Sequence, residues 1–215
     1  MRAEIVKINS ETPEMSLVKY AAEQIRAGQV LGMPTDTFYG LAADPFNLRA
    51  VDRVYEIKSR SRHKPLSLLI ESVDQAEELA YSLPAPFYEL ARKFWPGPLT
   101  VIVRAGSRLP LKVTANTGNV ALRVPAAKIP LEVVKAAAIP ITATSANLSG
   151  ASECTSAEQV RGQLQDRIPI IVDGGQSPRE IASTILDLSD ETAGWRVLRE
   201  GAIPIDEIAK FFAQG

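Results

Sequence analysis

The chain has 215 residues, of which 46% are apolar and 23% are charged, a composition typical of a folded globular protein and not of a disordered one. Its 24 Lys and Arg nearly balance its 25 Asp and Glu, so the net charge of -1 argues against strong non-specific binding of the whole protein to nucleic acid or anionic membranes. The single cysteine, Cys154, excludes an internal disulfide and a cysteine-rich zinc site.

The N-terminal residues carry no apolar run long enough for a signal peptide. No window of the chain approaches the roughly 18 consecutive apolar residues that a membrane helix needs. A lone cysteine fits a reducing compartment. We therefore expect a cytoplasmic protein that does not act at a membrane.

Helix patterns recur along the whole chain. The first has its apolar residues on one face and ends at Gly28. We expect Asn47 to cap the second helix, and the patterns Ser72-x-x-Gln75 and Thr155-x-x-Glu158 to open two more. The expected helices cover residues 16–27, 47–58, a segment opened at 72, 86–94, 129–138, a segment opened at 155, and 205–212.

Strand patterns lie between these helices. Strict alternation of strand and helix fails around residues 99–124 and 168–198, so we expect a mixed sheet. The sequence predicts an α/β fold in a single domain over residues 1–215, with a twisted mixed parallel/antiparallel sheet flanked by helices. The expected strands cover residues 30–34, 65–70, 99–104, 119–124, 139–144, 168–172, 183–188 and 195–198.

Polar residues follow the first of these apolar strands. Thr35, Asp36 and Thr37 come directly after a run closed by Pro34. Such residues are common in turns, where their side chains bond nearby backbone. However, α/β folds also bind ligands beyond the carboxyl ends of their strands. The stretch is either a turn or the wall of a ligand site.

The densest positive charge lies between residues 58 and 64. Lys58, Arg60, Arg62 and Lys64 alternate with short polar residues and with His63, and no acidic residue interrupts them. In an extended segment this alternation places the four cations on one side. Such a row suits a phosphate chain, because Arg forks bind oxyanions in pairs and Lys adds a compact charge. A solvated loop is the alternative.

Two further stretches are rich in small polar residues. In "ITATSANLSG" an apolar strand breaks into hydroxyl and amide residues, including Thr144, Ser145 and Asn147, which can donate and accept hydrogen bonds. In "DGGQSPREIASTILDL" a glycine turn precedes Ser183 and Thr184. A Ser/Asn-rich turn and an ordinary β-turn are the respective alternatives.

Several familiar catalytic motifs are missing. The sequence has no G-x-x-x-x-G-K-[ST] loop, no G-x-G-x-x-G fingerprint and no G-x-S-x-G elbow. One histidine and one cysteine do not make a zinc site. An enzyme with this sequence would work through positioning and charge stabilisation, as phosphoryl and nucleotidyl transfer enzymes do.

Seven motifs occur in order: PTDTFYGLAAD, VYEIKSRSRHKPL, WPGPLTVIV, VALRVP, ATSANLSG, ASTILDL and VLREGAI. Together they resemble the YrdC/TsaC-type threonylcarbamoyl-AMP synthases over about residues 28–203. Enzymes of that family combine L-threonine, bicarbonate and ATP, release pyrophosphate and form threonylcarbamoyl-adenylate, the donor for N6-threonylcarbamoyladenosine in tRNA. The resemblance implies this nucleotidyltransferase activity and a YrdC-like fold around a concave ligand cavity.

The resemblance also assigns residues. It implies that Lys58 and Arg60 are catalytic and stabilise charge on the phosphates. It implies ATP as substrate, accompanied by Mg²⁺, and neither a tightly bound metal nor an organic cofactor. Independently of the family, an arginine on a strand facing a cavity suits a substrate carboxylate, which supports the role of Arg123. The implied nucleotide contacts are Lys58, Arg60, Arg62, Ser145, Asn147 and Arg199, and the implied threonine contacts are Thr35, Ser67, Arg123 and Ser183.

Two alternatives stay open. One is a related enzyme that forms a different carbamoyl-adenylate, as the similar domain of hydrogenase-maturation proteins does with carbamoyl phosphate. The other is a double-stranded RNA or tRNA binding protein whose 58–64 row contacts backbone phosphate. The resemblance implies that the product passes to the tRNA threonylcarbamoyl-transfer machinery. It leaves direct tRNA binding, the oligomeric state and the roles of Asp36 and His63 open.

Overall fold

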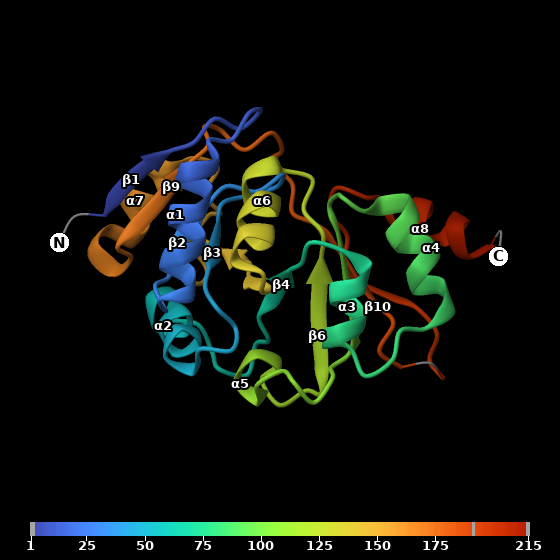
Figure 1. Ribbon diagram of the computed structural model, residues 1–215. Coiled ribbons are helices and arrows are strands. Elements are labelled where there is room, and N and C mark those ends of the chain that lie inside the picture. The colour runs from blue at the N-terminus through green and yellow to red at the C-terminus, as the bar shows by residue number, and fades with distance from the viewer. Residues whose placement is uncertain (1–2, 191, 214–215) are drawn as a thin grey trace.

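The computed structural model describes residues 3–190 and 192–213, whose strands pair into two mixed sheets (Figure 1). In the first sheet β1 pairs in parallel with β9 and β2 pairs antiparallel with β3. The predicted α/β fold with mixed pairing is therefore confirmed, with the strands divided between two sheets. The first sheet has the order β1 (Glu4–Lys7), β9 (Ile170–Asp173), β2 (Leu31–Met33), β3 (Gly40–Ala42) and β8 (Thr144–Ser145).

The second sheet joins six strands that come mostly from the middle and end of the chain. Its central pair, β5 and β6, is antiparallel, whereas β10 pairs in parallel with β5 and β4 with β6. Its order is β11 (Arg196–Arg199), β10 (Thr184–Asp187), β5 (Leu99–Arg104), β6 (Asn119–Arg123), β4 (Ser67–Leu69) and β7 (Ile141–Thr142).

The strand predicted over residues 139–144 divides at Ala143. β7 pairs with β4 in the second sheet, and β8 pairs with β3 in the first. Ala143 donates its N–H to the Ser67 carbonyl at 2.9 Å and its carbonyl accepts the Ser67 hydroxyl at 3.1 Å. A single residue thus passes the chain from one sheet to the other.

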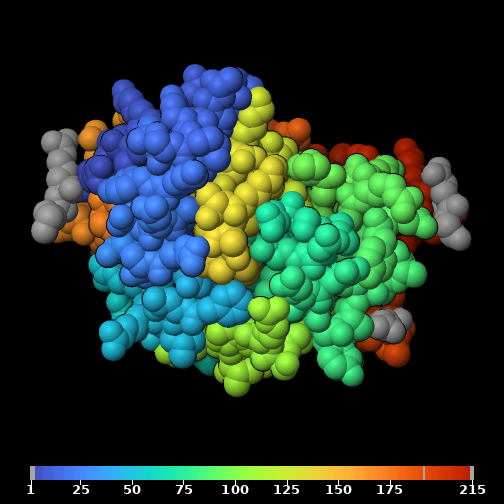
Figure 2. Space-filling model, in the orientation of Figure 1, coloured from blue at the N-terminus to red at the C-terminus, as the bar shows by residue number. Residues whose placement is uncertain are grey.

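Helices cover the outer faces of both sheets. α1 packs beside α6, and the space-filling view shows α6 wedged between α1 and α3 (Figure 2). β1 and α8 lie at opposite ends of the molecule (Figure 1). The helices are α1 (Met15–Arg26), α2 (Leu48–Lys58), α3 (Val73–Leu79), α4 (Ala85–Phe94), α5 (Leu111–Thr114), α6 (Lys128–Ala137), α7 (Ala157–Leu164) and α8 (Ile205–Ala213).

Two of the three predicted helix starts are confirmed. Asn47 caps α2, and Ser72 accepts the Gln75 N–H at the start of α3. The expectation for Thr155 is wrong, because Ser156 caps α7 by accepting the Gln159 N–H. Thr155 instead contacts the Gln159 side chain.

The core consists of two clusters of buried apolar side chains. The larger includes Phe87 and Leu122 of the second sheet and its helices, and the smaller lies between the first sheet and the pair α1 and α6. Burying each large apolar side chain contributes roughly 1.5–3 kcal/mol, so these clusters hold the strands that carry the polar residues below. Within residues 3–190 and 192–213, no helix has the length and apolar character required to cross a membrane.

Candidate active site

A cavity of about 380 Å³ is lined by residues of both sheets. β3 and β8 contribute from the first sheet, and β4, β5, β6, β10 and β11 contribute from the second. Three predicted residues, Lys58, Arg62 and Asn147, are not in this lining. The predicted site residues that do line the cavity are Thr35, Arg60, Ser67, Arg123, Ser145, Ser183 and Arg199.

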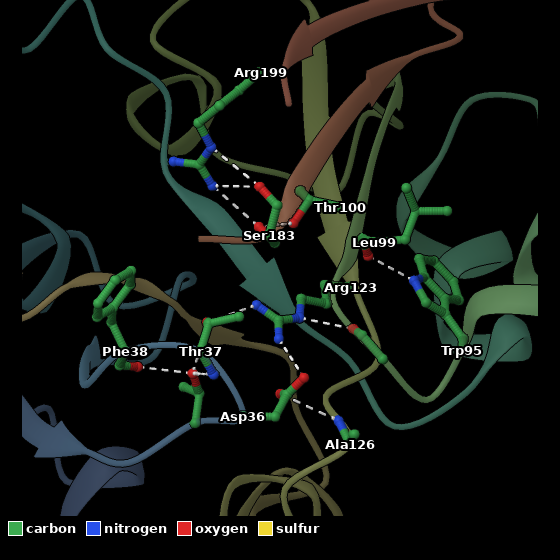
Figure 3. A network of polar contacts seen from close by, with 12 residues as sticks. Asp36, Thr37, Phe38, Trp95, Leu99, Thr100, Arg123, Ala126, Ser183 and Arg199 are labelled. Carbon is green, nitrogen blue, oxygen red and sulfur yellow. Dashed lines mark hydrogen bonds and ion pairs between the residues drawn. The ribbon is translucent and has the colours of Figure 1, made fainter. Parts of the chain in front are cut away.

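Arg123, the last residue of β6, lines this cavity and forms a buried ion pair with Asp36 (Figure 3). Its Nη2 lies 2.6 Å from Asp36 Oδ2, an ion pair without the directional geometry of a hydrogen bond. Its Nε donates to the Gly97 carbonyl at 2.9 Å and its Nη1 to Thr37 Oγ1 at 3.1 Å. The other Asp36 oxygen accepts the Ala126 N–H at 3.2 Å. Burial lowers the pKa of Arg123, and the Asp36 charge opposes that shift.

The Thr35–Thr37 stretch is both a turn and a cavity wall. Thr35 Oγ1 donates to the Phe38 carbonyl at 2.7 Å and accepts the Thr37 N–H at 3.1 Å, so its side chain closes the turn. Thr35 and Thr37 also line the cavity. The turn is therefore confirmed, and the ligand site stays a prediction for a stretch that lines the cavity.

A second polar group, Ser183, Thr100 and Arg199, lies on the neighbouring strands (Figure 3). The Ser183 and Thr100 hydroxyls are 2.9 Å apart. Arg199 donates through Nε and Nη2 to the Ser183 carbonyl, at 3.1 and 2.9 Å, and through Nη2 to the Ser183 hydroxyl at 3.1 Å. These contacts leave Nη1 of Arg199 without a partner among the residues that the structure describes.

Thr184 fixes the segment that carries Arg199. Its fully buried hydroxyl donates to the Ile203 carbonyl at 2.6 Å and accepts the N–H groups of Gly201 and Ile203, each at 3.0 Å. At Gly201 a Cβ would lie 2.3 Å from the Ala182 carbonyl oxygen, so only glycine permits this approach. The segment following β11 is thereby clamped against the start of β10.

Lys58 ends α2 and is almost completely buried, at 1% exposure. Its Nζ donates to the Asn147 carbonyl at 2.8 Å, to Asn147 Oδ1 at 3.1 Å and to the Ser145 carbonyl. Burial is the largest cause that lowers its pKa, to about 8, helped by the Arg60 charge and opposed by Glu153. Lys58 therefore organises the Ser145–Asn147 segment from behind the cavity wall.

Arg60 is partly buried and lines the cavity. Its Nη2 donates to the Pro65 carbonyl at 2.9 Å, and its Nε lies 3.4 Å from the Lys64 carbonyl. Nη1 has no partner within the described part of the chain. Both contacts are uncharged, so the Arg60 charge is not neutralised by an acidic side chain.

The prediction of a one-sided cationic row is wrong. α2 ends at Lys58 and Ser59 adopts a left-handed conformation, so residues 58–64 do not form an extended segment. Arg62 is exposed and forms an ion pair with Asp52 of α2, whose other carboxylate oxygen is 2.6 Å from Lys112 Nζ. Arg62 therefore pairs with α2 and lies outside the cavity lining, whereas Arg60 is part of that lining.

The sequence interpretation missed two residues of the site, Thr100 and Glu153, which line the cavity. It singled out the stretches that contain Thr37, which also lines the cavity, and Thr184, which holds one of its walls, but it gave neither residue a role of its own. Thr184 follows Ser183, and nothing in the local sequence shows that Ser183 lines the cavity while Thr184 holds the segment after β11. Glu153 is the one carboxylate among the described residues that line the cavity. It has no local sequence signal at all.

Comparisons with known proteins agree on one family. The family model of Sua5, YciO and YrdC, described as "Telomere recombination", matches residues 23–201. The chain is 37% identical over 199 residues to a threonylcarbamoyl-AMP synthase of Pyrococcus abyssi, covering 92% of this chain and 57% of that protein. It is 38% identical over 192 residues to a threonylcarbamoyl-AMP synthase of Bacillus subtilis, covering 89% of this chain and 55% of that protein.

A solved structure shows the same fold. The crystal structure of P. abyssi Sua5 complexed with L-threonine superimposes with a TM-score of 0.92 at 37% identity, covering 96% of this chain and 60% of that one. The chain thus spans little more than half the length of these relatives.

Proposed function

Because this chain belongs to the Sua5/YciO/YrdC family, we propose that it is a threonylcarbamoyl-AMP synthase that uses L-threonine, bicarbonate or CO2, and ATP. One observation carries the proposal: the cavity holds Arg123, which a buried carboxylate neutralises, and two arginines that form no ion pair within residues 3–190 and 192–213, Arg60 and Arg199. This set suits one carboxylate substrate and one polyphosphate substrate.

The threonine carboxylate would bind Arg123. Asp36, Thr37 and Gly97 fix the guanidinium plane, and one N–H group on Nη1 remains for a second carboxylate. Thr35, Ser67 and Ser183 line the same cavity and supply hydroxyls for the rest of the amino acid. The complex of Sua5 with L-threonine, a protein 37% identical to this chain, supports an amino-acid site in this fold.

The nucleotide would lie against Arg60, Ser145 and Arg199. Lys58 and Asn147 would act from behind this wall, since Lys58 holds both carbonyls of the Ser145–Asn147 segment. Mg²⁺ bound with ATP would neutralise phosphate charge. Arg62 does not line the cavity in this structure, so nothing in its placement supports a nucleotide contact.

The reaction follows from this arrangement. Bicarbonate supplies CO2 with loss of hydroxide, the neutral threonine amine adds to the CO2 carbon, and one N–H proton passes to that hydroxide, so that an N-carboxylate and water form. One oxygen of that carboxylate attacks the α-phosphorus, the bond from the α-phosphorus to the bridging oxygen breaks, and pyrophosphate leaves. Charge accumulates on phosphate oxygens during this step, and Arg60, Arg199 and the Lys58 ammonium stabilise it. The adenylate would then pass to the machinery that modifies tRNA.

Pyrophosphate release from ATP by the purified protein tests the proposal. We expect release only when both L-threonine and bicarbonate are present, with threonylcarbamoyl-adenylate detected by mass spectrometry. Release that instead requires carbamoyl phosphate would keep the adenylation chemistry and replace the substrate. Absence of release under every condition, combined with salt-sensitive binding of tRNA, would favour an RNA-binding protein.

A further inference from the structure

Among the described residues, Glu153 is a carboxylate without an ion-pair partner in a cavity that three arginines line. It lies between the Ser145–Asn147 segment and α7, is partly buried and lines the cavity. Within residues 3–190 and 192–213 it takes part in no ion pair. Its carboxylate oxygens are therefore available to a ligand that enters the cavity.

Glu153 shares the cavity with the two arginines to which we assign the phosphates, Arg60 and Arg199. Both arginines donate only to uncharged groups. The Glu153 charge raises the pKa of Lys58 and of Arg199 against the larger effect of burial, so the carboxylate lies within electrostatic reach of both. A polyphosphate bound by these cations would lie close to Glu153.

Two anions so placed repel each other unless a cation bridges them. Like charges a few ångströms apart disfavour each other strongly in a partly dry site. Mg²⁺ removes this conflict, because it takes oxygen ligands and is usually bound through one or two protein carboxylates together with substrate phosphates. A cavity with one available carboxylate fits that pattern.

We propose that Glu153 is the protein ligand of the Mg²⁺ ion that ATP brings into the cavity. This inference rests on the proposed function, since it needs a nucleotide in this cavity. It assigns the Glu153 carboxylate oxygen to the metal, directly or through a metal-bound water, and leaves the arginines to the phosphate oxygens. The protein would then select the magnesium complex of ATP over the free nucleotide.

Calorimetric titration with α,β-methylene ATP, which cannot release pyrophosphate at the α-phosphorus, tests the assignment in Mg²⁺ and in EDTA. We expect the wild-type protein to bind the magnesium complex at least tenfold more tightly than the free nucleotide. Glu153→Gln should weaken binding of the magnesium complex at least fivefold, while binding of the free nucleotide stays the same or tightens. Glu158→Gln removes the same charge from an exposed position on α7 and should match the wild type.

The outcomes separate the inference from the function on which it rests. Equal or tighter binding of both nucleotide forms to Glu153→Gln would show that Glu153 only balances the arginines, and would overturn the metal assignment alone. Absence of nucleotide binding to the wild-type protein would contradict the proposed function and the assignment together. Unchanged thermal unfolding of Glu153→Gln is the control for folding, since the carboxylate has no ion-pair partner to lose.

Discussion

Asp36 Oδ2 lies 2.6 Å from Arg123 Nη2, and each side chain is only 8% exposed. A residue from a turn of the first sheet is thereby tied to the last residue of a strand in the second. The pair neutralises a buried arginine while holding its plane toward the cavity. If Arg123 binds the threonine carboxylate as proposed, stability and substrate binding depend on the same two residues, and different substitutions separate the two effects.

The pair predicts a specific pattern of stability. Asp36→Ala should lower the free energy of unfolding by about 3–5 kcal/mol, because it leaves the Arg123 charge buried and unpaired. The double variant Asp36→Ala/Arg123→Met should cost less than the sum of the two single variants, because no charge is left alone. Urea unfolding of all four proteins measures this. Additive losses would mean that the pair contributes no coupling.

Arg123→Lys keeps the charge opposite Asp36 but removes the planar fork. We expect the threonine KM to rise about 10- to 100-fold, which corresponds to the loss of roughly 1.5–3 kcal/mol from a charge-assisted hydrogen bond. The KM for ATP should change less than about twofold, which corresponds to less than about 0.4 kcal/mol. Steady-state pyrophosphate release gives both constants. A rise confined to the ATP KM would assign Arg123 to the nucleotide instead.

Arg60 and Arg62 form a natural comparison, since they are two residues apart and only Arg60 lines the cavity. Arg60→Ala should abolish adenylate formation with the fold intact. Arg62→Ala loses an exposed ion pair with Asp52, and surface pairs contribute about 0–1 kcal/mol, so its activity should remain near that of the wild type. Pyrophosphate release and circular dichroism check both. Equal loss in the two variants would restore Arg62 to the nucleotide site.

Lys58 predicts a pH dependence of stability. Its pKa in the folded protein is about 8, below the unfolded value of 10.5. Between these pH values the unfolded chain binds more protons than the folded protein. The Lys58 contribution to the free energy of unfolding therefore rises as the pH increases from about 8 to 10.5, and this gain is lost when the pH falls back through 8. Urea unfolding from pH 7 to 10 should show this rise, about 3 kcal/mol at most, in the wild type relative to Lys58→Met. Parallel curves would contradict the shifted pKa.

Thr184→Val keeps the shape of the side chain and removes the hydroxyl that holds the segment after β11. We expect a loss of about 1–3 kcal/mol in stability, from the buried N–H groups left unpaired, and an increase in the ATP KM through displacement of Arg199. Thr184→Ser should restore both. Thr114→Val removes another buried threonine hydroxyl, in α5, and should leave both KM values unchanged. An unchanged ATP KM in Thr184→Val would leave Thr184 a purely structural residue.

Local patterns in the sequence predicted much of this fold. The strand over 99–104 matches β5 residue for residue, and the helix that Asn47 caps ends at Lys58 as expected. The apolar run of β5 and the cap of α2 each involve residues close together in the sequence, so local patterns reveal both. The short strand β3 and the four-residue helix α5 were missed, because so few residues carry no readable period.

The remaining features of the site depend on contacts between distant segments. The alternating charges suggested that Arg62 shares a face with Arg60. In the structure the left-handed Ser59 ends the helix, and Arg62 forms an exposed ion pair with Asp52. Glu153 enters the cavity only because two sheets meet there. The pairing of Asp36 with Arg123 spans 87 residues of sequence, and neither residue alone indicates the other.

The crossing at Ala143 has a consequence for what the cavity can accept. Ala143 is bonded to Ser67 of one sheet through both its N–H and its carbonyl, and the next residue already pairs with Leu41 of the other. Successive Cα atoms are about 3.8 Å apart, so the spacing of the two walls at this point is set by a single peptide unit. The sheets cannot slide apart here to admit a bulkier substrate without breaking backbone pairing. At this one point the backbone fixes the spacing of the two walls, so only the side chains that line the cavity can change the room it offers there.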